Sequence, residues 1–306
     1  MTAPTQLRSS RAAKGLGLRR LVVGTDFSPD GNRAVRRAAS LPFTPGASLL
    51  LVHVIPAGIA PAVASLATGA AEIRLEALAA RLRDAFEGRR RADVSVHARV
   101  VRGSPPDVLD RLGRAFRAEV IVVGRRGQSR IRELVLGSTA RRLLRGGRLP
   151  VLVVGHPPSD LYRRAVVGFD FTPEALRAAR MTRQVVPHSA TLFAVHTFEN
   201  PYRGLPTGLI PDRTIRIEEV LRERARLVRK AMDTVGRGAR PWEVLVREGD
   251  PRRVLLELVR SRRADLVAVG SAGKSRVART FLGSVAEAVL EAAPSDVLLV
   301  RRRPLR

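Results

Sequence analysis

The sequence contains no cysteine among its 306 residues. This absence excludes disulfide bonds, thiolate zinc sites and cysteine nucleophiles, and it favours a reducing, cytoplasmic location. Aromatic residues are also scarce, at 4%. Few rings are therefore present on which the bases of a single-stranded nucleic acid could stack.

The sequence also lacks an apolar run of the roughly 20 residues that a membrane-spanning helix needs. The stretch from Leu49 to Ala71 comes nearest, but Pro56 and Pro61 interrupt it. Residues 1–18 carry basic side chains without a following apolar segment, so we predict a disordered basic tail there rather than a signal peptide. We expect a soluble protein with no membrane contact.

Acidic residues are outnumbered, with 28 Asp and Glu against 55 Lys and Arg, which gives a net charge of +27. Such a charge raises the possibility of nucleic-acid binding. The arginines are scattered through predicted helices, as at Arg33, Arg36 and Arg37, rather than gathered in one block. Solvated helix faces explain this distribution better, so specific nucleic-acid binding is the weakest of our hypotheses.

A glycine pattern, Gly-x-x-Gly-x9-Gly-Ser, occurs twice, each time directly after an apolar, strand-like run. The two copies are Gly124, Gly127, Gly137 and Ser138, and Gly270, Gly273, Gly283 and Ser284. Glycine at the end of a strand lets the backbone approach a ligand closely and adopt positive φ. A Gly-Ser pair that opens a helix directs free N–H groups at an anion. The repeat therefore predicts two phosphate-binding loops.

The whole chain is one unit written twice, because further segments of the first half recur about 145 residues later. Residues 22–28, 50–54 and 102–105 recur as 166–172, 192–197 and 248–251. We predict two homologous domains, 19–156 and 160–303. The consecutive prolines Pro157 and Pro158 mark the linker between them.

Short apolar strands alternate with helical patterns in each half, which is typical of a parallel sheet covered by helices on both faces. The first half has predicted strands near 20–25, 48–55, 95–101, 119–124 and 150–154, and predicted helices near 30–40, 71–88, 106–117 and 137–146. The second half repeats this order, with its long helix near 214–235. In the helix at 71–88 the expected buried face is Ile73, Ala77, Leu78, Leu82 and Phe86. The predicted fold class is α/β, with two tandem doubly wound, five-stranded, Rossmann-like domains.

In these features the chain resembles the universal stress protein family in its tandem, two-domain form. The resemblance rests on Asp26 and Asp170 after the first strand of each half, on a histidine in each second strand, and on both glycine patterns. It implies that ATP or a related adenine nucleotide, with Mg²⁺ as an optional companion, binds at the carboxyl ends of the strands. It also implies a stress-response sensor or regulator rather than a dedicated enzyme.

Carried over by position, the resemblance implies a set of nucleotide-binding residues in each half. In the first half these are Gly24, Asp26, Val54, Val123, Gly124, Arg126, Gly127, Gly137, Ser138 and Thr139. In the second half they are Gly168, Asp170, Thr197, Val269, Gly270, Gly273, Gly283, Ser284 and Val285. Asp26 would lie near the nucleoside and Arg126 would add charge for the phosphates; the alternative for Asp26 is a turn or helix-capping residue.

The second half departs from the first at two of these places. Ala272 replaces the loop arginine and Thr197 replaces Val54, although Lys274 could supply charge. Because of these two differences, we expect the first site to be the better one. Both halves share a further departure, since they carry alanine, at Ala140 and Ala286, where some nucleotide-binding members have a hydroxyl group.

Other sites and activities are less well supported by the sequence. His53 and His196 each lie in an apolar strand without a carboxylate neighbour, so we predict packed histidines bonded to backbone. The five histidines show no close pairing, so no metal site is expected. A slow ATPase or adenylyl-transfer activity and a scaffold that binds no nucleotide remain alternatives. The final strands, 150–154 and 296–300, are the candidates for packing the halves as an intramolecular pseudo-dimer, and a further homodimer stays open.

Overall fold

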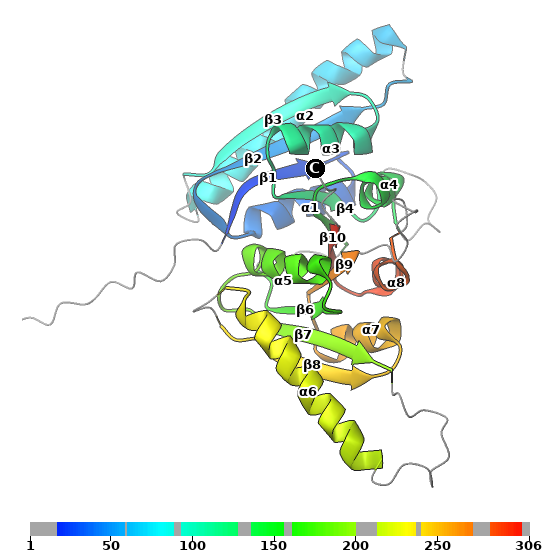
Figure 1. Cartoon of the computed structure of the whole chain (residues 1–306). Helices are drawn as coiled ribbons and strands as arrows, with labels where there is room; N and C mark the ends of the chain where they lie inside the picture. Colours follow the sequence, from blue (N-terminus) through cyan, green and yellow to red (C-terminus); the bar gives the residue numbers. More distant parts are fainter. Residues whose placement is uncertain are drawn as a thin grey trace, which may run out of the picture.

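The computed structural model describes residues 17–58, 60–88, 93–127, 136–155, 161–199, 213–236, 240–271 and 282–301. They form one ten-stranded sheet with the strand order β3-β2-β1-β4-β5-β10-β9-β6-β7-β8 (Figure 1). Residues 1–16, most of the predicted tail, and the linker prolines lie outside the described residues.

The two halves repeat one order of elements. The first half comprises β1 (Leu18–Gly24), α1 (Pro29–Ser40), β2 (Phe43–Ile55), α2 (Pro61–Gly88), β3 (Ser95–Arg102), α3 (Pro105–Ala115), β4 (Val120–Gly124), α4 (Ser138–Gly146) and β5 (Val151–Val154). The second comprises β6 (Arg164–Gly168), α5 (Pro173–Val185), β7 (Thr191–Phe198), α6 (Arg213–Asp233), β8 (Glu243–Glu248), α7 (Pro251–Ser261), β9 (Leu266–Ser271), α8 (Ser284–Ala292) and β10 (Asp296–Arg301). Strand pairing within each half is parallel, which confirms the predicted α/β fold.

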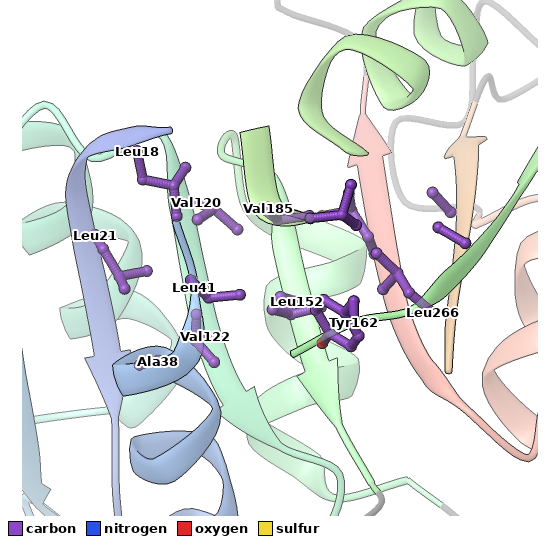
Figure 2. Close-up of a cluster of buried hydrophobic side chains, with 14 of the residues drawn as sticks. Leu18, Leu21, Ala38, Leu41, Val120, Val122, Leu152, Tyr162, Val185 and Leu266 are labelled. Atoms are coloured by element: carbon purple, nitrogen blue, oxygen red, sulfur yellow. The ribbon is translucent and has the colours of Figure 1, made fainter. Parts of the chain in front are cut away.

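Helices cover both faces of the sheet and enclose two apolar cores. Helices α1, α2, α5 and α6 pack on one face, and α3, α4, α7 and α8 pack on the other. Each core contains residues of both halves. Figure 2 shows the core on the α1 side, where side chains of β1, β4 and β5 lie beside side chains of β9 and of the segment before β6. Strand residues alternate between the two cores, as at Leu152 and Val153.

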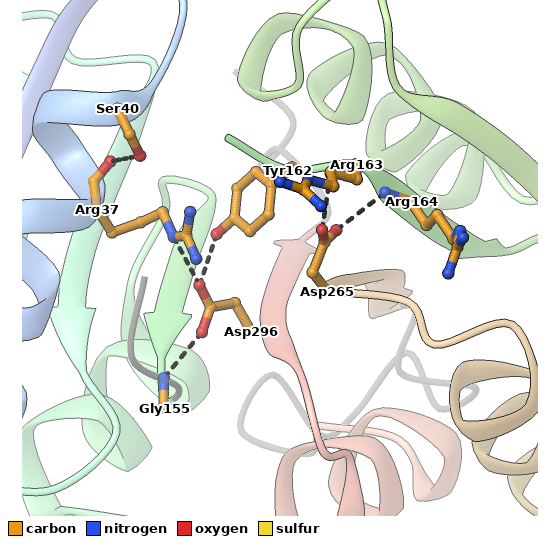
Figure 3. A network of polar contacts seen from close by, with 8 residues as sticks. All are labelled: Arg37, Ser40, Gly155, Tyr162, Arg163, Arg164, Asp265 and Asp296. Carbon is orange, nitrogen blue, oxygen red and sulfur yellow. Dashed lines mark hydrogen bonds and ion pairs between the residues drawn. The ribbon is translucent and has the colours of Figure 1, made fainter. Parts of the chain in front are cut away.

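The halves meet where β5 and β10 pair in antiparallel fashion, with Leu152 opposite Leu298. A polar network lies beside this pair (Figure 3). The buried carboxylate of Asp296 accepts from Arg37 Nε at 2.9 Å and from the Tyr162 hydroxyl at 2.8 Å, while its other oxygen accepts from Gly155 N at 3.0 Å. The Arg37 guanidinium also lies 4.1 Å from the centre of the Tyr162 ring. Helix α1, the end of β5, the segment before β6 and the start of β10 are therefore held together at this junction.

Three local expectations were wrong. Leu18, which we placed in the tail, begins β1 and is fully buried. Helix α2 begins at Pro61, ten residues before its predicted start, which proline permits because it fits the first turn of a helix. Ile73 and Ala77 are exposed, while Leu75 and Ala79 are buried in their place.

No helix in the described part of the chain has the length and apolar character to cross a membrane.

Candidate functional site

The turn that follows the first strand has the same unusual backbone in both halves. Phe27 has a φ of 62° and Phe171 a φ of 63°, which non-glycine residues seldom adopt. In the first half, Asp26 Oδ1 accepts from Ser28 N at 3.0 Å and Thr25 Oγ1 accepts from Phe27 N at 3.1 Å. These bonds hold the left-handed turn and fix the position of the Asp26 carboxylate.

Asp26 therefore has the turn role that we considered as an alternative, but it is not the helix cap. That place belongs to Ser28, whose hydroxyl oxygen accepts from Gly31 N at 3.0 Å. The other carboxylate oxygen of Asp26 faces the glycine loop, since a Cβ placed on Gly127 would lie 2.8 Å from Oδ2. One side chain thus links the turn to the loop.

The glycine loop after β4 packs tightly against the start of α1. A Cβ on Gly124 would lie 2.6 Å from the backbone carbon of Asp30, which no side chain could accept without movement. Arg126 N donates to Asp30 Oδ2 at 3.0 Å and secures the same contact. Position 124 requires glycine because the backbone of Asp30 approaches it closely, not because its φ is positive. Among the motif glycines of the described chain, Gly283 is the one with a positive φ, at 80°.

Helix α4 begins at the end of this loop. Gly137 is its N-cap and supplies no capping side chain, while Gly137 N donates to the Arg125 carbonyl at 2.8 Å. The first helical residues, Ser138 and Thr139, follow without a side-chain cap on their N–H groups. Unsatisfied N–H groups and the positive end of the helix dipole favour an anion here.

These segments enclose a cavity of about 520 Å³ at the carboxyl ends of β1, β2 and β4. All ten first-half residues that the resemblance implies line it: Gly24, Asp26, Val54, Val123, Gly124, Arg126, Gly127, Gly137, Ser138 and Thr139. The size is in the range of small-molecule sites. The structure therefore brings the predicted set together in one place.

Three further lining residues were not predicted for the site. The Phe27 ring stacks on His53 with centroids 4.4 Å apart, and the Arg74 guanidinium lies 4.2 Å from the Phe27 ring centre. Arg74 comes from α2 and lies within the predicted helix at 71–88, but outside the buried face that we expected for it. His53 had been predicted as a packed residue, and its Nδ1, 2.9 Å from the Thr25 carbonyl, confirms the backbone contact.

The charge around the cavity is mainly positive. Arg74 and Arg126 line it, and Asp26 is the one acidic residue among the described lining residues. Asp30, just behind the loop, forms an ion pair with Arg33. Across the described residues, no three His, Asp or Glu side chains lie close enough together to hold a metal ion. The arrangement can bind an anion with an apolar portion.

The second half places its predicted residues at equivalent points. Gly168 ends β6, Thr197 lies near the end of β7, Val269 and Gly270 lie at the end of β9, and Gly283, Ser284 and Val285 open α8. Asp170 Oδ1 accepts from Thr172 N at 3.1 Å and repeats the turn of the first half. Gly273 lies outside the described residues, as do Ala272 and Lys274. The structure therefore shows only part of this copy.

Comparisons with known proteins agree with the repeat. The model of the universal stress protein family matches residues 17–155 and again residues 161–301. A universal stress protein of Mycolicibacterium smegmatis is 28% identical over 301 residues, covering 92% of this chain and 97% of its own. One from Methanocaldococcus jannaschii is 30% identical over 149 residues, 47% of this chain and 84% of that protein. The crystal structure of a universal stress protein from Archaeoglobus fulgidus has a TM-score of 0.68 at 19% identity and covers 93% of this chain and 98% of that one, which shows a common fold.

Proposed function

The chain belongs to the universal stress protein family, and we propose that its first half binds ATP or a related adenine nucleotide. The observation that carries this proposal is the cavity of about 520 Å³, because all ten first-half residues implied by the family resemblance line it. The protein would act as a cytoplasmic sensor or regulator whose state depends on the bound nucleotide.

The layout of the sheet supports a ligand with an apolar base at one end and phosphates at the other. Strands β2 and β4 flank β1, so their carboxyl ends lie about 10 Å apart. On the β2 side the cavity is lined by Val54, Ile55, Pro56 and the alanines of α2. On the β4 side it is lined by Arg126 and by the start of α4. The base would contact the first group and the phosphates the second.

The described residues fit Mg²⁺ only as a companion of the nucleotide. Mg²⁺ keeps several waters and is commonly held by substrate phosphates with one or two carboxylates. Asp26 is the one lining carboxylate of the described chain, and it already holds the turn through Oδ1. We propose that phosphates and water supply most of the ligands, with Asp26 as the nearest protein carboxylate.

Isothermal titration with ATP tests the proposal directly. A valine at Gly137 would place a branched side chain before the N–H groups of α4, so Gly137→Val should lower affinity about tenfold or more. Gly146, at the other end of the same helix, has open space around a built Cβ, so Gly146→Val is the matched control. No binding by the native protein, together with no nucleotide released by acid extraction, would refute the proposal.

We also propose that the first site binds more tightly than the second, since Arg126 lines the first cavity and alanine takes its place in the second loop. Substitution at Gly283 would strain a backbone with φ 80°. The cleaner comparison therefore uses Ser138→Ala and Ser284→Ala. The first should remove the tighter phase of the titration, and equal effects of the two changes would contradict the asymmetry.

A further inference from the structure

Each half extends an arginine to the C-terminal end of the last helix of the other half. The Arg125 guanidinium donates to the carbonyls of Leu290 and, at 3.0 Å, Ala293 at the end of α8. Arg301 of β10 donates to the carbonyls of Arg145 and Gly147 at the end of α4. The last carbonyls of a helix lack partners within it and form the negative end of its dipole, so both contacts are stabilising caps.

The two caps come from complementary positions of the repeat. Arg125 follows β4 at the position of Ser271 in the second half, and Arg301 stands at the position of Gly155 in the first. Gly155 leaves the room that Arg125 needs, because a Cβ there would lie 2.8 Å from Arg125 Cδ. Ser271 instead donates within its own half, to the Leu282 carbonyl at 2.6 Å. In the described part of the chain, the contact from a glycine loop to the other half is thus made by Arg125, and Ser271 does not repeat it.

Arg125 contacts the first candidate site and the far end of the helix that opens the second. Its carbonyl accepts from Gly137 N at 2.8 Å at the start of α4, where the phosphates of the first site are proposed to bind. Its side chain holds the end of α8, the helix that opens with Gly283 and Ser284 of the second glycine pattern. Burial, and next the adjacent Arg126 charge, lower the pKa of Arg125, so the two cations repel each other. Phosphates beside Arg126 would relieve this repulsion.

We propose that Arg125 couples the two glycine motifs, so that nucleotide bound at the first strengthens the cap on α8 and changes the affinity of the second. The inference rests on the proposed function of the first half. The two states differ in whether the Arg125 guanidinium holds the α8 carbonyls, and a ligand that fixes the loop favours the capped state. Because coupling is reciprocal, a ligand at the start of α8 acts back on the first site. Arg301 lies in β10 rather than in a glycine loop, so its cap on α4 is expected to stay the same whether or not the first site is filled.

Hydrogen–deuterium exchange of the full chain with and without ATP tests the coupling. The segment 136–146 reports binding at the first site, and the segment 284–293 reports the state of α8. In the native protein ATP should slow exchange in both segments, by about fivefold or more in α8. Arg125→Gln should keep the first response and lose the second. Arg301→Gln, which removes the equivalent cap from the other helix, should keep both.

Two more variants separate coupling from direct binding and from misfolding. Gly137→Val closes the first site, so the α8 response should vanish; its persistence would mean that ATP acts on α8 directly and would overturn the proposal. Gly155→Ala displaces the Arg125 side chain without changing the loop, and should reproduce Arg125→Gln. The coupling is also overturned if Arg125→Gln keeps the full α8 response. It is likewise overturned if ATP slows exchange in segment 136–146 of the native protein but not in α8. If neither segment responds and dialysis shows no bound ATP, the proposed function fails as well.

Discussion

At the scale of single residues, the histidine of β7, His196, is held as one tautomer by a backbone contact. His196 Nδ1 lies 2.8 Å from the Phe169 carbonyl, so Nδ1 carries the proton in the neutral ring. Nε2 is buried and has no hydrogen-bond partner within the described chain. Adding a proton would create a buried N–H group without an acceptor, and burial accordingly lowers the pKa of His196.

This predicts that His196 makes stability depend on pH. The unfolded chain has a histidine pKa of about 6.5 and the folded chain a lower one, so below about pH 6.5 the unfolded state binds more protons. The contribution of His196 to the free energy of unfolding is fully present above about pH 6.5. It is lost as the pH falls through the pKa that His196 has in the folded state. His196→Asn keeps a donor for the Phe169 carbonyl but cannot titrate. Urea midpoints between pH 7.5 and 5 should fall less steeply in this variant than in the native protein; parallel profiles would contradict the assignment.

The residues of the first site could be predicted because each belongs to a short segment with its own signal. A strand end, a glycine spacing or a Gly-Ser helix start can be recognised without knowing what lies opposite. Phe27 and Arg74 could not be predicted in the same way. Phe27 enters the site through a left-handed turn, and Arg74 is one more exposed arginine of a predicted helix, with nothing in the sequence to mark it for the cavity. Arg125 differs again, because its partners lie 165 and 168 residues further along the chain.

At the scale of elements, α2 shows why one helix boundary was missed. Its first turns carry Val63 and Leu66 on the solvent side, 56% and 79% exposed, so apolar periodicity there does not report burial. Small residues, including Ala67 and Ala70, line the cavity instead. Figure 1 shows this end of α2 extending beyond the ends of β2 and β3. Ala64 is buried near the start of the helix, but the regular buried face of Ala71, Leu75, Ala79, Leu82 and Phe86 begins at Ala71, where our predicted helix started.

Two leucines of α2 should therefore differ sharply in their effect on stability. Leu75 is 1% exposed and belongs to the core, so Leu75→Ala should reduce the free energy of unfolding by about 2–5 kcal/mol. Leu66 is 79% exposed, and Leu66→Ala should change it by less than about 0.5 kcal/mol. Urea unfolding followed by circular dichroism gives both values. A Leu66→Ala cost as large as that of Leu75→Ala would show that the start of α2 packs against another surface in solution.

At the scale of the whole molecule, the halves form a single sheet with two shared cores rather than two separate globules. The edge strands that join them could be predicted, because each closes its half. The charged junction beside them could not: Arg37 and Asp296 are 259 residues apart, and Tyr162 follows the linker. In a sequence this rich in arginine, the pattern of residues does not distinguish an arginine on the surface of a helix from one that is buried in an ion pair.

Removal of Arg37 should weaken the molecule as a unit. Arg37→Met leaves the Asp296 carboxylate, fully buried, with the Tyr162 hydroxyl and Gly155 N–H as its remaining partners shown in Figure 3. An uncompensated buried charge costs about 3–5 kcal/mol, so the free energy of unfolding should fall by that amount.

The matched control for this change is Arg222→Gln, because Arg222 pairs with Glu218 on an exposed face of α6. It should cost less than about 1 kcal/mol. Trp242, the one tryptophan, lies in the second half and reports its unfolding by fluorescence, while circular dichroism reports both halves. The two probes should give coincident transitions in the native protein. A small effect of Arg37→Met, comparable with that of Arg222→Gln, would mean that the apolar pairing of β5 and β10 alone holds the halves together.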